Sequence, residues 1–241
     1  DIFGHVASGQ ADVGVVPLEN ALAGSVHENY DLLGEFPVSI IAEAYLPVEL
    51  HLMSLPGSDV GHIQQVLSHP KALEQCSKFL EERATLSQVI CSDTAGAALE
   101  VRRRGDASLA AIASEEAAQE HNLQIIARGI QNHAMNATRF VAISASPNVE
   151  AKADKCSLLF TLPHQPGSLA RILAAVAGQD GNITKIESRP MPGKPFEYAF
   201  YLDIQAPLDS QDCISRCIEA ISGSAASCRV LGRYRAAPPL F

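Results

Sequence analysis

The stretch Asn136-Ala137-Thr138-Arg139-Phe140, continued by Val141-Ala142-Ile143, lies between two different sequence patterns. Strand alternation predicts that Thr138 and Phe140 share one face and that Arg139 lies on the other. Taken alone, this is a β-branched residue beside a solvated arginine, a common strand pair. Helix starts rich in Ser, Thr and Asn precede it, however, and a compact strand-helix-strand-strand-helix-strand pattern follows it. This context makes the stretch a candidate for function.

Upstream, residues 1–145 read as an α/β domain. The apolar segment from Asp12 to Pro17 predicts a buried strand that carries Asn20 to its carboxyl end, where ligands bind in open α/β sheets. Ser25 and Glu28 have the spacing of a capping box. Further predicted elements are paired strands at 38–44 and 47–53, a helix at 71–82 capped by Ser68 or His69, and a helix at 95–103 capped within Ser92-Asp93-Thr94.

Downstream, residues 146–155 are polar and predict a linker, and residues 156–235 predict a second domain. Pro166-Gly167-Ser168 precedes a helix with apolar residues at helical spacing. Strands before and after that helix, a hairpin, a second helix and a last strand complete the order βαββαβ. This order is that of the ferredoxin-like α+β fold.

The composition excludes several classes of protein. The chain has 241 residues, enough for two domains, and a net charge of -9. An acidic chain repels phosphate backbones, so we expect no nucleic-acid partner. No apolar run reaches the length of a membrane span, and no signal peptide is visible. The spacing of six cysteines and eight histidines predicts a reduced interior and no metal site.

Several of the predicted elements place hydroxyl or amide side chains at helix starts, namely Asn20 near Ser25, Ser68, and Ser92 to Thr94. Helix N-termini carry partial positive charge and N–H groups, so they bind carboxylates well. If these ends converge, they suit a small dianion; otherwise they are ordinary caps. The pattern alone leaves the substrate open.

Motifs along almost the whole chain resemble those of prephenate dehydratases and the related arogenate dehydratases. They are Gly14 to Asn20 with Gly24-Ser25-Val26, Tyr30 to Leu33, Leu67 to Pro70 with Gln75-Cys76, Asp93 to Ala98, Ala111 to Ser114, Asn136 to Phe140, Pro166 to Ala170, and Glu187 to Pro190. The resemblance implies a two-lobed, periplasmic-binding-protein-like α/β catalytic domain with its active site between the lobes, followed by an ACT regulatory domain. The family's usual first strand and glycine-rich turn are absent before Asp1, so we expect the first lobe to be N-terminally incomplete.

The resemblance also implies an activity that needs no cofactor. Prephenate would lose CO2 and water to give phenylpyruvate, or arogenate would give phenylalanine. Thr138 is then the catalytic residue, because it can donate a hydrogen bond to the departing hydroxyl. The matching motifs make Asn20, Ser68, Gln75 and Thr94 substrate-positioning groups. Arg139 could bind a substrate carboxylate, but its predicted face favours a structural ion pair.

For the second domain, the resemblance implies feedback inhibition by phenylalanine bound at a dimer interface, in a homodimer or homotetramer. The implied effector-binding residues are Gly167, Ser168, Leu169, Asn182, Glu187, Ser188, Arg189 and Pro190. Such a module can also serve only to dimerise. The rival function for the whole chain is a catalytically inert module that binds a small anion or phenylalanine. We expect a cytoplasmic protein, or one of the plastid stroma if the source is a plant or alga.

Overall fold

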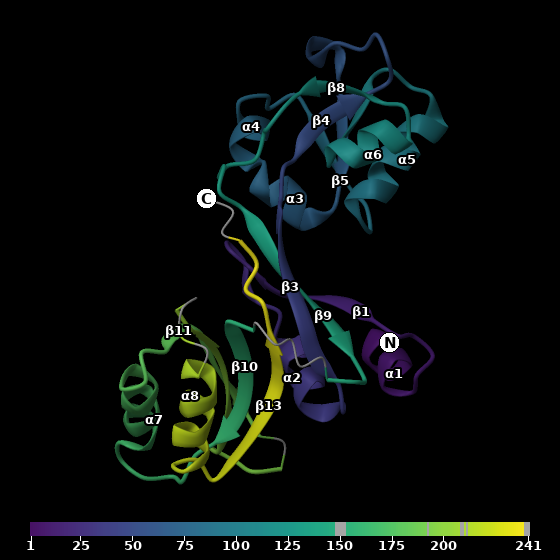
Figure 1. Ribbon diagram of the computed structural model, residues 1–241. Coiled ribbons are helices and arrows are strands. Elements are labelled where there is room, and N and C mark those ends of the chain that lie inside the picture. The colour runs from purple at the N-terminus through teal and green to yellow at the C-terminus, as the bar shows by residue number, and fades with distance from the viewer. Residues whose placement is uncertain (148–152, 192, 208–209, 211, 239–241) are drawn as a thin grey trace. The chain divides into compact units, whose positions relative to one another are not determined.

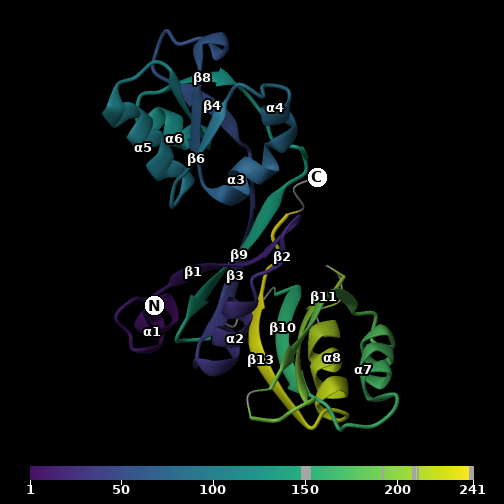
Figure 2. The same cartoon turned by 180° about the vertical axis from the view of Figure 1, so that it is seen from behind.

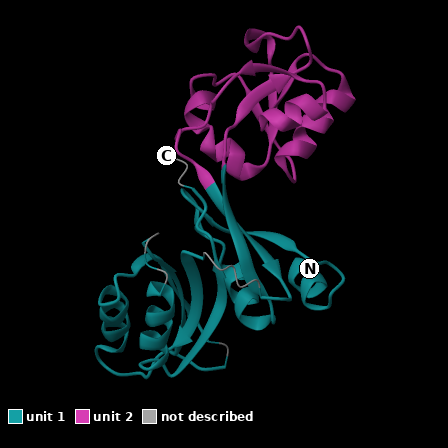
Figure 3. Cartoon of the chain, in the orientation of Figure 1, with its two compact units in different colours: residues 1–46, 138–241 teal, residues 47–137 magenta. Residues whose placement is uncertain are grey.

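The computed structural model describes residues 1–147, 153–191, 193–207, 210 and 212–238 (Figure 1). The chain divides into two compact units (Figure 3). Unit 1 contains residues 1–46 and 138–241, and unit 2 contains residues 47–137. The chain therefore enters unit 2 after Leu46 and returns to unit 1 at Thr138. These limits differ from a division at the predicted linker, because residues 1–46 and the C-terminal domain belong to a single unit.

Unit 2 is built on a five-stranded sheet with the order β6-β5-β7-β4-β8. Its elements are β4 (His51–Ser54), η1 (Val60–His62), β5 (Gln65–Ser68), α3 (Pro70–Gln75), α4 (Ser77–Glu81), β6 (Ser87–Ile90), α5 (Thr94–Arg104), β7 (Leu109–Ala113), α6 (Glu115–Glu120) and β8 (Gln124–Ala127). β5 is parallel to β6 and β7, whereas β4 is antiparallel to β7 and β8. Every residue of β7 is buried, and alternate residues such as Ala111 and Ile112 enter different apolar cores. The central strand is therefore covered on both faces.

The first part of unit 1 is a small lobe with a four-stranded sheet of order β2-β1-β9-β3. Its elements are α1 (Ile2–Ala7), β1 (Gly14–Asn20), β2 (Gly24–Ser25), α2 (His27–Glu35), β3 (Ser39–Pro47) and β9 (Ala137–Ser144). β1 and β9 are antiparallel, so a strand near the start of the chain pairs with the strand that carries Thr138. This lobe is called the first lobe below.

The second part of unit 1 has the predicted βαββαβ order. Its elements are β10 (Lys155–Thr161), α7 (Ser168–Ala177), β11 (Asn182–Pro190), β12 (Tyr198–Gln205), α8 (Cys213–Ser222) and β13 (Ser227–Tyr234). The antiparallel sheet has the order β11-β12-β10-β13. Both α7 and α8 lie on one face of this sheet, and α2 of the first lobe lies toward the other (Figures 1 and 2). Below, this sheet is called the regulatory sheet, after the regulatory domain that the resemblance implies.

The face of the regulatory sheet that α7 and α8 leave uncovered packs on the first lobe. One apolar core contains Tyr201, Leu231 and Tyr234 of the sheet together with side chains of the lobe such as Leu33 and Ile40. The contact is tight enough to require a glycine, because a Cβ on Gly232 would lie 2.1 Å from the Ile40 carbonyl oxygen. Arg229 of β13 also donates to the carbonyls of Gly34, Phe36 and Val38, at the end of α2 and just after it. Such donors satisfy carbonyls that a helix end leaves unpaired.

Three local predictions are wrong. The predicted strands 38–44 and 47–53 do not pair, since β3 and β4 belong to different sheets. The predicted helix 71–82 is interrupted at Cys76 and forms α3 and α4. The predicted capping box does not form, because Ser25 belongs to β2 and the N-cap of α2 is Val26, which makes no side-chain cap bond.

We expect Gly232→Ala to lower the free energy of unfolding by about 1–3 kcal/mol, because overpacking a rigid contact forces the backbone to move. The check is the urea midpoint followed by circular dichroism, since the chain has no Trp. Gly4→Ala is the matched control, because its added Cβ meets nothing within 4 Å and α1 favours alanine. An unchanged midpoint for Gly232→Ala would contradict the close packing of β13 on β3.

Candidate active site

The pairing of β1 with β9 brings Asn20 and Thr138 together, as cross-strand partners. The Asn20 side-chain nitrogen Nδ2 donates to Thr138 Oγ1 at 3.0 Å. On its other side, the Asn20 oxygen Oδ1 accepts from the backbone N–H groups of Leu22 and Ala23, at 3.1 and 2.9 Å. This turn fixes which end of the amide faces Thr138, because a flipped amide would point its NH2 group at two donors.

The Thr138 hydroxyl is thereby oriented for donation. A hydroxyl has one proton and two acceptor lone pairs, and Asn20 occupies one of the lone pairs. The proton of the Thr138 hydroxyl therefore points away from Asn20. The side chain is half-buried, so it is partly accessible. A partly exposed hydrogen-bond donor, held from behind by an amide, is suited to an oxygen on which negative charge develops.

Arg139 lies on the opposite face of β9, as strand alternation predicts. Only 4% of its side chain is exposed. Its Nε donates to Glu43 at 2.8 Å, a second nitrogen pairs with Asp203, and the third donates to Tyr234 at 2.9 Å. All three nitrogens thus have protein partners. These contacts form the structural ion pair that its face favours, and they favour it over the predicted binding of a substrate carboxylate.

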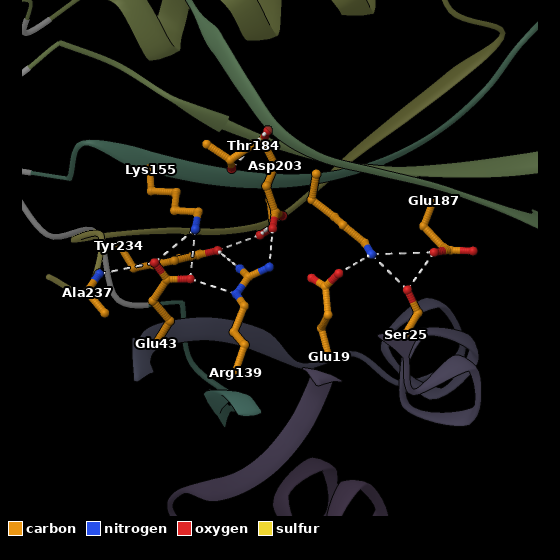
Figure 4. A network of polar contacts seen from close by, with 12 residues as sticks. Glu19, Ser25, Glu43, Arg139, Lys155, Thr184, Glu187, Asp203, Tyr234 and Ala237 are labelled. Atoms are coloured by element: carbon orange, nitrogen blue, oxygen red, sulfur yellow. Dashed lines mark hydrogen bonds and ion pairs between the residues drawn. The ribbon is translucent and has the colours of Figure 1, made fainter. Parts of the chain in front are cut away.

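The polar network around Arg139 joins the first lobe to the regulatory sheet (Figure 4). Glu43 also accepts from Lys155 at 2.9 Å, so two cations face two carboxylates in a buried cluster. Ser157 gives its proton to Asp203 at 2.5 Å, and Tyr234 must therefore be the donor in its 2.7 Å bond to Ser157. Burial and the Asp203 charge raise the pKa of Tyr234 well above its usual value, which keeps this phenol protonated.

A second polar group lies beside the first one along the same contact (Figure 4). Lys185 of β11 pairs with Glu19 of β1 at 2.7 Å and donates to Ser25 at 2.8 Å. Ser25 donates in turn to Glu187 at 2.6 Å, and His27 lies 3.3 Å from the same carboxylate. Burial favours the neutral form of Glu187, but the Ser25 hydrogen bond and the nearby cations outweigh it and hold the pKa of this carboxyl below its usual range.

The other predicted substrate residues belong to unit 2. Ser68 is fully buried, and its hydroxyl donates to the Ile112 carbonyl at 2.6 Å. This bond joins β5 to β7, and it favours a structural role for Ser68 over the predicted positioning of the substrate. Gln75, the last residue of α3, and Thr94, the first residue of α5, are both half-buried. The cap of α5 is Asp93, as expected, which accepts from Gly96 N–H at 2.6 Å.

The structure divides the predicted effector residues between the two faces of the regulatory sheet. Glu187 and Arg189 face the first lobe, where Arg189 makes two bonds of 2.8 and 2.6 Å to Asp31. Ser188 and Pro190 are the cross-strand partners of Phe200 and Tyr198, so they share the opposite face with these rings. Asn182 lies at the other end of β11 and is exposed.

A cavity of about 520 Å³ lies on that opposite face of the regulatory sheet. Its lining residues include Leu162, Ser168, Leu169, Met191, Tyr198 and Phe200. Ser168 and Leu169 begin α7, directly after Gly167, whose φ of 80° requires a residue that tolerates the left-handed region. The cavity thus combines aromatic and aliphatic walls with the N-terminus of a ten-residue helix.

The comparisons with known proteins agree with this arrangement of domains. The model of the family "Prephenate dehydratase" matches residues 1–148, and that of the ACT domain matches residues 157–212. The chain belongs to the prephenate dehydratase family. Its fold class is that of the family, a two-lobed, periplasmic-binding-protein-like catalytic domain with a C-terminal ACT domain. The regulatory sheet is therefore the sheet of the ACT domain.

Among relatives in the prephenate dehydratase family, the chain is 36% identical to "Arogenate dehydratase/prephenate dehydratase 2, chloroplastic" of Arabidopsis thaliana. That match covers 92% of this chain and 61% of the relative, so the chain spans less than two thirds of the relative's length. A prephenate dehydratase from Arthrobacter aurescens, solved in complex with L-Phe, is 28% identical with a TM-score of 0.81, covering 97% of this chain and 78% of that one. GqqA, described as a novel type of quorum quenching acylase, is 30% identical with a TM-score of 0.84, covering 98% and 86%.

In the part of the chain that the structure describes, no helix is both long and apolar enough to cross a membrane. The charged residues that join the first lobe to the ACT domain carry no motif in the sequence. They are Glu19, Glu43, Lys155, Lys185 and Asp203. One signal was visible, because Asp203 interrupts the otherwise apolar segment Phe200 to Ile204. A single carboxylate in a buried strand requires a partner.

We expect Arg139→Met to lower the free energy of unfolding by about 3–5 kcal/mol, because it leaves buried carboxylates without their partner. Urea denaturation followed by circular dichroism measures the change. Arg103→Gln removes an arginine from an exposed ion pair with Glu100 and should leave the midpoint almost unchanged. Equal midpoints for Arg139→Met and the unmodified chain would show that the buried network does not stabilise unit 1.

Proposed function

We propose that this chain catalyses the decarboxylating dehydration of prephenate to phenylpyruvate, or of arogenate to phenylalanine. The observation that carries the proposal is the hydrogen bond from Asn20 to Thr138, whose geometry leaves the threonine proton for a substrate oxygen. The family supports it, as do relatives whose names include both substrates. Incubation of the full chain with prephenate and with arogenate, in parallel, tests the activity and distinguishes the substrates by the product formed.

The reaction assigns a limited task to the protein. The bond between the ring and its carboxylate carbon breaks and releases CO2, and the electron pair forms the new ring double bond. The bond from the opposite ring carbon to the hydroxyl oxygen breaks with its electron pair on the oxygen, which takes up a proton from solvent and leaves as water. Because the product ring is aromatic, the protein mainly has to orient the substrate and stabilise the departing oxygen. The Thr138 hydroxyl donates to that oxygen, while Asn20 holds Thr138 in place.

Gln75 and Thr94 stay predictions as substrate-positioning groups. Both are accessible in part, and Thr94 stands at the N-terminus of an eleven-residue helix, where partial positive charge favours a carboxylate. Oligomeric state, cellular compartment and the choice between prephenate and arogenate are likewise predictions.

For the ACT domain, the proposal includes inhibition by phenylalanine bound in the cavity of the regulatory sheet. The apolar walls suit a phenyl ring, and the start of α7 suits a carboxylate. Of the predicted effector residues, Ser168 and Leu169 line this cavity, Gly167 directly precedes them, and Ser188 and Pro190 lie on the same face of the sheet. Glu187 and Arg189 serve the contact with the first lobe instead, since their side chains already pair with lobe residues.

Thr138→Val removes the hydroxyl but nearly keeps the shape of the side chain. We expect turnover of the preferred substrate to fall about a hundredfold or more, since a donor aimed at developing charge contributes about 3 kcal/mol. Thr138→Ser is the matched control, because it keeps the hydroxyl, and should retain most of the activity. Circular dichroism confirms that both variants are folded. Near-normal turnover in Thr138→Val would exclude this hydroxyl from the mechanism, and substrate binding without turnover in the unmodified chain would favour the inert binding module.

Tyr198→Ser removes an aromatic wall of the cavity. We expect the dissociation constant for phenylalanine to rise about tenfold or more, because lost burial of an aromatic ring costs at least about 1.4 kcal/mol. Isothermal titration calorimetry measures the constant. Glu187→Gln alters the opposite face of the regulatory sheet and should change it only about threefold or less. The reverse result, with affinity lost in Glu187→Gln alone, would place phenylalanine on the face toward the first lobe.

A further inference from the structure

The two faces of the strand pair β1–β9 carry two different sets of side chains. Consecutive cross-strand pairs are Asn20 with Thr138 and Glu19 with Arg139. The first pair forms the hydrogen bond of the candidate active site. The second pair points the other way, to the regulatory sheet, where Glu19 meets Lys185 and Arg139 meets Asp203. Each residue of the active-site pair is therefore one peptide unit from a residue bound to the ACT domain.

The regulatory sheet presents a matching pair of charges. Lys185 and Asp203 are cross-strand partners on β11 and β12, just as Glu19 and Arg139 are partners on β1 and β9. The result is a quartet in which opposite charges are cross-strand neighbours within each sheet and form ion pairs between the sheets. Partners opposite each other in an antiparallel pair share a face, so both sheets turn their charged pair toward the contact. Figure 4 shows Arg139 pointing at Asp203, and Glu19 beside them.

We propose that Glu19 and Arg139 are positioning residues, through which the ACT sheet sets the geometry of Asn20 and Thr138. This inference rests on the proposed function and specifies how its regulation reaches the active site. β12, the strand of Asp203, also carries two walls of the cavity, Tyr198 and Phe200, and β12 is paired with β11, the strand of Lys185. Binding in the cavity shifts β11 and β12, and the two ion pairs pass the shift to β1 and β9.

The first lobe and the ACT sheet also share an ion pair outside the quartet. Arg189 of β11 binds Asp31 of α2, at 2.8 and 2.6 Å. The side chains of Arg189 and Asp31 are 24% and 42% exposed, and those of Lys185 and Glu19 are 15% and 33% exposed. The two ion pairs are therefore exposed to solvent to a similar degree. Because Asp31 lies on a helix and not on the strand pair, removal of this bridge should weaken the contact without disturbing the position of Thr138.

The experiment compares four variants of the full chain, namely Lys185→Met, Glu19→Gln, the double variant and Asp31→Asn. For each, turnover is measured without phenylalanine and with saturating phenylalanine, and their quotient is the inhibition ratio. We expect either quartet variant to reduce this ratio about fivefold or more, the lower end of typical coupling between sites. The double variant should match the single ones, because all three remove one link. Asp31→Asn should keep the ratio within about twofold of the unmodified chain.

Equal loss of inhibition in Asp31→Asn would overturn the inference, because any contact between lobe and ACT sheet would then suffice. The inference would also be overturned if all four variants kept the inhibition ratio of the unmodified chain, or if phenylalanine did not inhibit the unmodified chain. In both cases, turnover of the substrate would still support the proposed function. If no turnover occurs with either substrate, the proposed function fails, and hydrogen exchange of residues 14–20 and 137–144 decides the inference. Added phenylalanine should alter the exchange of these residues in the unmodified chain and in Asp31→Asn, but not in Lys185→Met. If phenylalanine does not alter the exchange in the unmodified chain, the inference is overturned.

Discussion

Arg139 is a permanent positive charge in the interior of unit 1, and much of the unit's arrangement follows from neutralising it. A buried cation is tolerated only when its hydrogen bonds are satisfied and its charge is balanced. No single element of the first lobe provides this: Glu43 comes from β3, whereas Asp203 and Tyr234 come from the ACT sheet. The strand that carries Thr138 is therefore complete only when the ACT domain is in contact with it.

This contact determines what each face of the ACT sheet can do. One face binds the first lobe through Lys185, Asp203 and the apolar core, and the cavity lies on the other face, beside the start of α7. Strand alternation then separates neighbouring residues of one motif. Glu187 and Arg189 serve the contact between domains, and Ser188 and Pro190 lie on the face of the cavity.

The features that could be predicted from the sequence are those that depend on residues close together in the chain. Alternation in β9 and the βαββαβ order are properties of consecutive residues, as is the Asp93 cap, and the structure has all three. Ser25 and Ser68 were assigned from equally local signals, but their partners lie far along the chain. Ser25 binds Glu187, and Ser68 binds Ile112. A hydroxyl is small and adaptable, so its role follows from the tertiary neighbour and not from the motif.

The same reasoning explains why Thr138 and Arg139, adjacent in sequence, have unrelated tasks. A strand turns successive side chains to opposite faces, so a conspicuous dipeptide is two separate sites joined by one peptide bond. Thr138 faces the turn that orients Asn20, and Arg139 faces the charges of the ACT sheet. Under the proposed function, such a bond is also the shortest possible connection between the Thr138 hydroxyl and the ACT domain, because neighbouring residues of a strand paired on both sides move together. The proposed link between turnover and the ACT domain then needs no longer path than β9 itself.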